Sequence, residues 1–178
     1  RTSLREQALA ERDGRKTDAL RWSLVAARTC GFIGRTDEAL AHAARAGVLA
    51  RETSDPELAA KAHYVRGMAL RGARRYDEAL QTLQAALDAL PAGRDEALRA
   101  EIHLETAETA LAAGFRDRAS EALARGSALV HWLQEPRLLA WSLYLRSAFE
   151  TPSPADLQLS AAYEIARTVD CPELQWQI

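Results

Sequence analysis

A fixed period of 40 residues organises the chain. Three stretches align with one another: "GRTDEALAHAARAGVLA" from Gly34, "RRYDEALQTLQAALDAL" from Arg74 and "FRDRASEALARGSALV" from Phe115. They share alanines at Ala39, Ala79 and Ala119, which lie 40 residues apart. Self-similarity at a period of roughly 20–50 residues is typical of proteins that stack one supersecondary unit many times. The repeat therefore predicts an array of similar units.

Each repeated stretch follows a second segment with helical spacing. These segments are "ALRWSLVAARTC" from Ala19, "AKAHYVRGMAL" from Ala60 and "AEIHLETAETAL" from Ala100, with apolar residues every three or four places. Each unit is thus expected to be a pair of helices. A small residue at the same place in every second helix lets the two helices approach closely at one repeated angle. We predict an all-α fold, an α-α solenoid wound as a right-handed superhelix.

Polar connectors with Pro or Gly separate the units. In "RETSDPEL" from Arg51, Ser54 or Asp55 is expected to cap a helix that begins at Pro56. A fourth unit has a different turn, "ETPSPADL" from Glu150, which we interpret as a loop variant. The predicted single array of residues 1–178 divides into the end of a preceding repeat (1–17), four repeats (18–57, 58–97, 98–136, 137–171) and the start of a further repeat (172–178).

The second unit, Ala62–Pro91, resembles the tetratricopeptide repeat (TPR) family. The matching residues are Gly67, Tyr76, Ala79, Ala86 and Pro91. The family repeat has roughly 34 residues, so these units are longer. They are similar to the repeats of large bacterial regulators of the MalT and LuxR type. The resemblance implies that the first helices of the pairs line a concave, peptide-binding groove.

Composition and motifs argue against several other functions. The 23 basic and 25 acidic side chains leave a net charge of −2, which favours neither nucleic acid nor an anionic membrane. Cys30 and Cys171 form no CxxC pair, so reduced thiols in a cytoplasmic protein are expected. The sequence contains no GxxxxGK[ST], HExxH or GxSxG motif. We expect no enzymatic activity, no cofactor and no metal.

A few polar residues are candidates for a metal, acid–base or nucleic-acid site. His63 and His103 lie one period apart, and packing is favoured over metal ligation. Glu101, Glu105 and Glu108 share a helix face, which is expected to be solvated. "GFIG" at 31–34 matches the GXXG loop of KH domains, and this match is interpreted as chance.

The family resemblance implies twelve groove residues: Arg21, Leu24, Arg28, Phe32, Lys61, Tyr64, Met68, Arg71, Glu101, Leu104, Glu108 and Leu111. Such a groove would run from basic to acidic and suit a protein or peptide with charges at both ends. The alternatives are a small-molecule effector and a groove filled by another part of the same protein. The carboxylate-clamp pattern of the family is not reproduced, because Leu24 and Tyr64 replace its Lys.

These features predict a non-catalytic scaffold, the sensor or interaction segment of a larger bacterial signalling or transcription regulator. The alternatives are a stand-alone adaptor and the substrate-recruiting repeats of a multidomain kinase, cyclase or protease. "LQWQI" at the C-terminus aligns with "LRWSL" from Leu20, so both ends are expected to cut through repeats. Trp176 is then expected to be poorly covered. Copies of the chain are expected to self-associate through the truncated ends.

Overall fold

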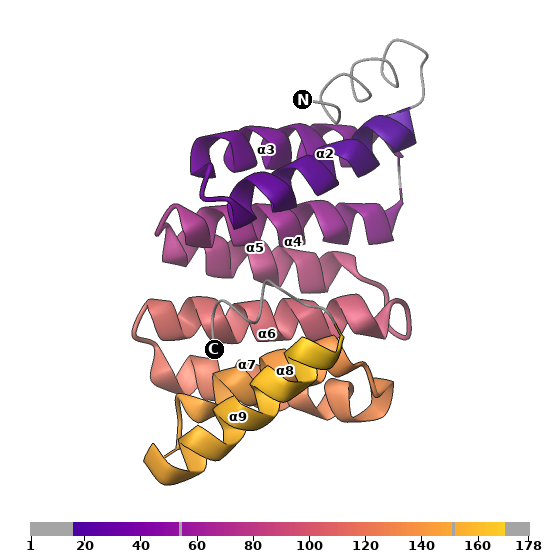
Figure 1. Ribbon diagram of the computed structural model, residues 1–178. Helices are drawn as coiled ribbons and strands as arrows, with labels where there is room; N and C mark the ends of the chain where they lie inside the picture. The colour runs from indigo at the N-terminus through magenta and orange to yellow at the C-terminus, as the bar shows by residue number, and fades with distance from the viewer. Residues whose placement is uncertain (1–15, 54, 151, 170–178) are drawn as a thin grey trace. The chain divides into compact units, whose positions relative to one another are not determined.

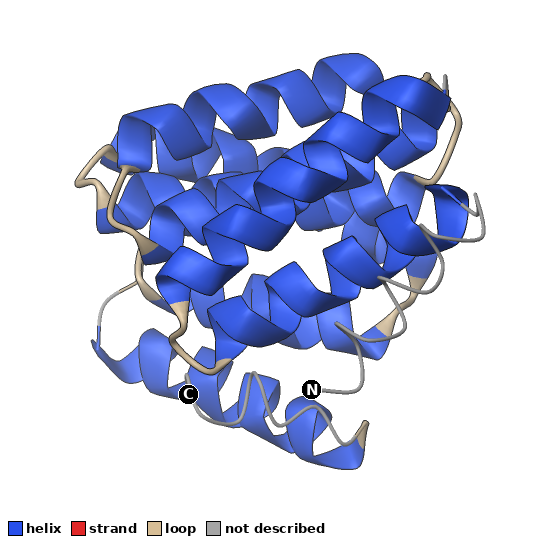
Figure 2. Ribbon diagram, turned by 90° about the horizontal axis from the view of Figure 1, so that it is seen from above, coloured by secondary structure: helices blue, strands red, loops and turns tan. Residues whose placement is uncertain are grey.

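The helices observed follow the predicted pairs. The structure is a computed structural model that describes residues 16–53, 55–150 and 152–169. Within these ranges it contains helices and turns and no strand (Figures 1 and 2). The helices are α2 (Lys16–Phe32), α3 (Thr36–Thr53), α4 (Pro56–Gly72), α5 (Tyr76–Ala89), α6 (Glu96–Ala112), α7 (Arg116–Leu133), α8 (Pro136–Ser147) and α9 (Pro152–Thr168). The all-α prediction is confirmed, whereas the prediction for Trp176 lies outside the described residues.

The chain forms two compact units, Arg1–Arg94 (unit 1) and Asp95–Ile178 (unit 2). Within unit 1, α2 packs against α3 and α4, α3 packs against α4, and α4 packs against α5 (Figure 1). Within unit 2, α6 packs against α7 and α8, α7 packs against α8, and α8 packs against α9. In each unit, the first helix of the second pair therefore contacts both helices of the first pair. The division of the sequence into repeats stays a prediction.

Small residues mark the places where paired helices approach closely. Ala39, Ala79 and Ala119, the alanines of the repeat, are all fully buried. In α4, a Cβ atom added at Gly67 would lie only 2.7 Å from Cγ and Cδ2 of Leu83 in α5. Because Leu83 is itself fully buried, its side chain has little room to move away. Gly67 thus permits the close approach of α4 and α5 at this crossing.

The three turns inside the helix pairs share one backbone geometry. Each turn contains one residue with positive φ, and these residues again lie 40 positions apart. They are Gly34 (φ 76°), Arg74 (φ 59°) and Gly114 (φ 81°). After each of them, the next amide donates to a carbonyl five residues back, as Arg75 N does to Leu70 O at 2.9 Å. This is the hydrogen bond of a Schellman C-cap, in which glycine is preferred at the left-handed position. "GFIG" therefore ends in a helix-terminating glycine, and Arg74 is the exception of the three.

Aspartates cap two of the first helices. Asp55 Oδ1 accepts hydrogen bonds from Glu57 N (2.9 Å) and Leu58 N (3.3 Å), directly before Pro56. This confirms a cap before Pro56 and assigns it to Asp55, one of the two residues predicted. Asp95 caps α6 in the same way through Leu98 N, at 3.0 Å. These side chains satisfy amides that the first turn of a helix leaves without a backbone partner.

The fourth pair begins its second helix earlier than the sequence predicted. Pro152 opens α9, so residues 152–157 of the segment interpreted as a turn belong to the start of that helix. Proline is tolerated there because the first helical amides have no intrahelical acceptor. The end of α8 is held by Arg116 of α7, whose Nη2 donates to Ala148 O at 2.9 Å and whose guanidinium lies 4.8 Å from the ring centroid of Phe149.

Among the described helices, none is both long and apolar enough to cross a membrane.

Replacing Gly67 with alanine should destabilise the protein. The added methyl group would overpack against Leu83, at a typical cost of about 1–3 kcal/mol, while alanine gains roughly 0.5–1 kcal/mol in helix propensity. We expect a net loss of about 1 kcal/mol in the free energy of unfolding, measured by urea denaturation. Gly47→Ala in α3 is the matched control, because the nearest atom to its added Cβ is Arg51 Nη1 at 4.0 Å. It should be neutral or stabilising, and equal losses in both variants would contradict the close approach at Gly67.

Replacing Arg74 with glycine should stabilise the protein. Left-handed backbone costs a residue with a Cβ about 1–2 kcal/mol, and glycine avoids this cost at a smaller entropic one. We expect the free energy of unfolding to rise by about 0.5 kcal/mol, whereas Gly114→Ala should lower it by about 1 kcal/mol. Urea denaturation of the two variants tests both signs. Loss of stability in Arg74→Gly would show instead that the arginine side chain holds its turn.

Candidate functional site

Three of the twelve predicted groove residues lie in the core. Leu24, Tyr64 and Leu104 occupy one position at successive periods, and they are 9%, 3% and 0% exposed. In α6, Leu104 packs in one hydrophobic cluster with Ala100 and Ala107, one turn to either side. Their predicted accessibility is therefore corrected, because this side of the helix faces the core. The binding role of the predicted groove residues stays a prediction.

The exposed side of α2 carries the basic part of the predicted site. Arg21, Arg28 and Phe32 are exposed, and Arg21 Nη1 lies 3.9 Å from Asp18 Oδ1 in the same helix. Val25, which is not one of the twelve predicted groove residues, is 52% exposed on the same side. Helical spacing could have found it, since positions 21, 25, 28 and 32 follow one face of a helix. The exposed face of α2 thus alternates arginine with apolar side chains.

The predicted residues of α4 are only partly accessible. Lys61, Met68 and Arg71 are half-buried. The ammonium group of Lys61 lies 2.6 Å from Glu57 Oε1, one turn earlier in the same helix. Its charge is therefore already balanced locally.

Within unit 2, two glutamates of α6 bind side chains of α8. Glu101 forms an ion pair with Arg137, and Trp141 Nε1 donates a hydrogen bond to Glu108 Oε2 at 2.9 Å. Neither contact was predicted, because both partners lie more than 30 residues further along the chain. The two carboxylates thus stabilise the packing of α8 on α6.

The solvated acidic face predicted for α6 is also corrected. Glu105 is fully buried, and Glu101 and Glu108 are half-buried. The fourth predicted residue of this helix, Leu111, is half-buried and packs against the core cluster of unit 2. This side of α6 is therefore packed against the rest of unit 2 and is not solvated.

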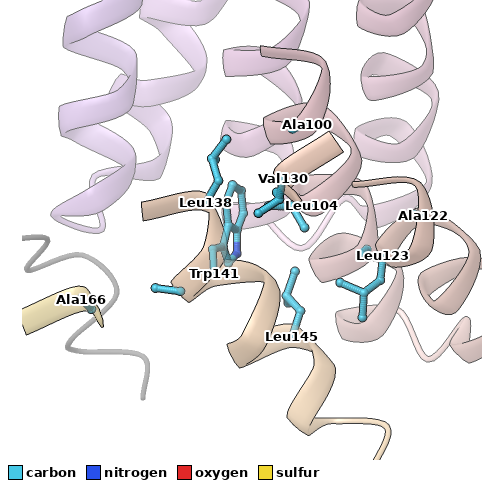
Figure 3. Packing of buried hydrophobic residues seen from close by; sticks show 11 residues of the cluster. Ala100, Leu104, Ala122, Leu123, Val130, Leu138, Trp141, Leu145 and Ala166 are labelled. Atoms are coloured by element: carbon cyan, nitrogen blue, oxygen red, sulfur yellow. The ribbon is translucent and has the colours of Figure 1, made fainter. Parts of the chain in front are cut away.

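A dense cluster supports the contacts between α6 and α8. Trp141 and Leu145 of α8 meet Leu104 of α6 and Leu123 of α7 in this cluster (Figure 3). Beside it, the hydroxyl groups of Ser127 and Ser142 lie 2.8 Å apart and link α7 to α8. An indole usually needs a hydrogen-bond acceptor when it is buried, and the carboxylate of Glu108 supplies one to Trp141.

The two periodic histidines are half-buried. Burial lowers the pKa of His63, with smaller contributions from Arg66 and Arg51. Burial also lowers the pKa of His103, assisted by Arg125 and Arg99 and opposed by Glu96. Both effects favour the neutral imidazole.

The thiol of Cys30 is half-buried, with its Sγ 4.0 Å from Glu38 Oε2. Burial raises the pKa of this thiol, and the charge of Glu38 raises it further while Arg35 opposes the change. A raised pKa leaves less of the nucleophilic thiolate at neutral pH. Within residues 16–53, 55–150 and 152–169, no three His, Cys, Asp or Glu side chains are placed to hold a metal ion. Cys171 lies outside the described residues.

A scan against models of known protein families gives no match, and a search of curated proteins gives no match either.

Protonation of His63 and His103 should lower stability in mildly acidic solution. Their pKa values are lowered in the folded state, so the unfolded chain takes up protons first as the pH falls below about 6.5. The free energy of unfolding should therefore fall between about pH 7.5 and pH 5.5. The variant His63→Gln with His103→Gln should flatten this part of the curve, measured by urea denaturation at each pH. An equal slope in this double variant and in the control His131→Gln, at an exposed position of α7, would contradict the assignment.

Proposed function

We propose that the chain is a TPR-like α-α solenoid that binds a protein or peptide. The observation that carries the proposal is the packing pattern that the two units share, in which each second pair stacks on both helices of the first pair. Buried alanines and matching turns at the 40-residue period support it. Arrays of stacked helix pairs offer extended surfaces, lined by equivalent helices, that suit elongated partners. The first helices α2 and α4 supply the contacts in unit 1.

The exposed side chains of α2 favour a macromolecular ligand. Arginine and large apolar residues at the surface are typical of protein interfaces, where aromatic side chains supply contact area and charges select the partner. Phe32 and Val25 are both more than half exposed, next to Arg21 and Arg28. A small-molecule effector remains the second ligand class of this proposal.

We infer a regulatory role for this binding. A bound partner would favour one curvature of the array and so change how the array packs against another part of a larger regulator. The chain would act as the sensor or interaction segment of a bacterial, cytoplasmic signalling or transcription protein, with catalysis carried out elsewhere. Differential affinity for the two curvatures would supply the free energy of the switch.

Site-specific photo-crosslinking tests the binding surface. The photoreactive amino acid p-benzoylphenylalanine replaces Arg28 in α2 or Met68 in α4, and the protein is irradiated in an extract of its own cells. We expect the same partner to be crosslinked from both positions, as identified by mass spectrometry. Gln81, an exposed residue of the second helix α5, is the control position and should give no adduct with that partner. Adducts of equal yield at Gln81, or none at positions 28 and 68, would contradict the proposal.

A further inference from the structure

The backbone of Arg74 adopts a left-handed conformation that is unfavourable for arginine. At the equivalent positions of two other turns the chain has Gly34 and Gly114, for which a positive φ carries no steric penalty. A residue held in a sparsely populated conformation is a candidate for function when the fold itself does not use its side chain. The contacts of the Arg74 side chain therefore show whether the arginine serves the fold.

Two other residues with positive φ use their side chains locally. Among the described residues, Asp95 (φ 41°) and Gln134 (φ 54°) are the remaining non-glycine residues of this kind. Asp95 Oδ1 accepts a hydrogen bond from Leu98 N at 3.0 Å. Gln134 Nε2 donates one to His131 O at 2.7 Å. The side chain of Arg74 is exposed and makes no hydrogen bond or ion pair with the residues that the structure describes, so such contacts do not account for it.

The ends of the two neighbouring helices do not explain the arginine either. A cationic side chain stabilises the C-terminal end of a helix, but Arg71 already supplies one in the last turn of α4. The next helix, α5, begins at Tyr76, and the positive end of its dipole opposes a cation directly before it. Arg74 therefore gains little from either helix end.

The exposure of Arg74 does not depend on what lies before the described residues. Within unit 1, the first helix pair already lies beside this turn. A Cβ atom added at Gly72 would lie 4.0 Å from Thr36 Oγ1, at the start of α3. The side of the turn toward the preceding pair is therefore occupied, and Arg74 is still exposed next to it.

The segment around Arg74 is basic and already binds one carboxylate. Arg75 donates from Nε to Glu78 Oε1 and from Nη2 to Glu78 Oε2, both at 2.7 Å. This hydrogen bonding lowers the pKa of Glu78, and the charges of Arg75 and of the exposed Arg66 lower it further. Residues 66–78 carry four Arg against one Asp and one Glu, an excess of two positive charges. The segment therefore stays positive after its own ion pair has formed.

An arginine that the fold does not use, within a basic turn, suits an acidic group of another molecule. Arginine binds carboxylates through two parallel hydrogen bonds, as Arg75 does with Glu78. We propose that Arg74, together with Arg66, binds the carboxylates of an acidic segment of a partner protein at the turn between α4 and α5. This inference rests on the proposed function and adds an acidic contact at the turn to the contacts proposed for α2 and α4.

Titration of the full chain with a short acidic peptide tests the site by NMR. The isotope-labelled protein receives acetyl-Gly-Glu-Glu-Glu-Glu-Gly-amide (the Glu peptide), and a peptide with Gln in place of each Glu is the control probe. We expect saturable shifts of the backbone amide and Nε–H signals of Arg74 with the Glu peptide alone, and weaker binding as salt is added. No saturable shift with the Glu peptide, or equal shifts with both peptides, would overturn the proposal.

Substitution of Arg74 separates binding from folding. Arg74→Gly should weaken binding of the Glu peptide by about three- to fivefold. The same variant should shift the midpoint of urea denaturation upward, because glycine relieves the left-handed backbone. Arg66→Gln should weaken binding by about twofold without that shift. The matched control is Arg94→Gly, at an exposed position of unit 1 without a positive φ, and it should leave the affinity unchanged. Unchanged affinity in Arg74→Gly, or an equal loss in Arg94→Gly, would overturn the proposal.

Crosslinking and a second ligand separate this inference from the proposed function. If Arg74→Gly binds the Glu peptide like the wild type while positions 28 and 68 still crosslink a partner, the site at the turn is wrong and the proposed function stands. If peptide binding requires Arg74 while positions 28 and 68 crosslink no partner, the contacts proposed for α2 and α4 are wrong and the turn remains the binding site. Inorganic phosphate is titrated in the same way, and tighter binding of phosphate than of the Glu peptide would overturn the proposal in favour of a phosphorylated ligand.

Discussion

The close approach of paired helices is the constraint on which the rest of the structure depends. Where α4 crosses α5, the absence of a side chain at Gly67 leaves just enough room for Leu83. Gly126 of α7 makes a similar contact in unit 2, because a Cβ added there would lie 3.0 Å from Leu104 Cδ2. Small residues at these crossings bring the backbones together, and large side chains from the partner helix fill the remaining volume. The two contacts also orient α4 and α7 about their own axes, with the glycine toward the paired helix.

That orientation explains which part of the candidate site the sequence could predict. Apolar spacing and capping residues located the helix pairs and the cap at Asp55, because these depend on neighbours within a few residues. The exposure of Tyr64 and Val25 depends on how far a helix is rotated against its neighbours, which a local period does not determine. The contacts of Glu101 and Glu108 with α8 depend on packing between pairs. The left-handed backbone conformation of Arg74 could not be predicted either, because the turn imposes it on a residue type that does not favour it.

The two units use equivalent helix positions in different ways. In unit 2, carboxylates of α6 are bound by α8 and hold two pairs together. In unit 1, the equivalent positions of α2 carry arginines that the described residues leave largely solvated. Helices at equivalent places in the two units can diverge in this way, because a position that stabilises one pair can change its charge in another without altering the helix. Equivalent positions thus stabilise the packing of one helix pair and face solvent in another.

The indole of Trp141 has a spectroscopic consequence. It is buried in the cluster of unit 2 (Figure 3). Its Nε1 donates a hydrogen bond to Glu108, whereas Trp132 of α7 is 84% exposed. A buried indole emits at shorter wavelength than a solvated one and is shielded from quenchers in the solvent. Trp141 is therefore expected to contribute a shielded component at shorter wavelength to the emission of the four tryptophans, and Trp132 a solvated component.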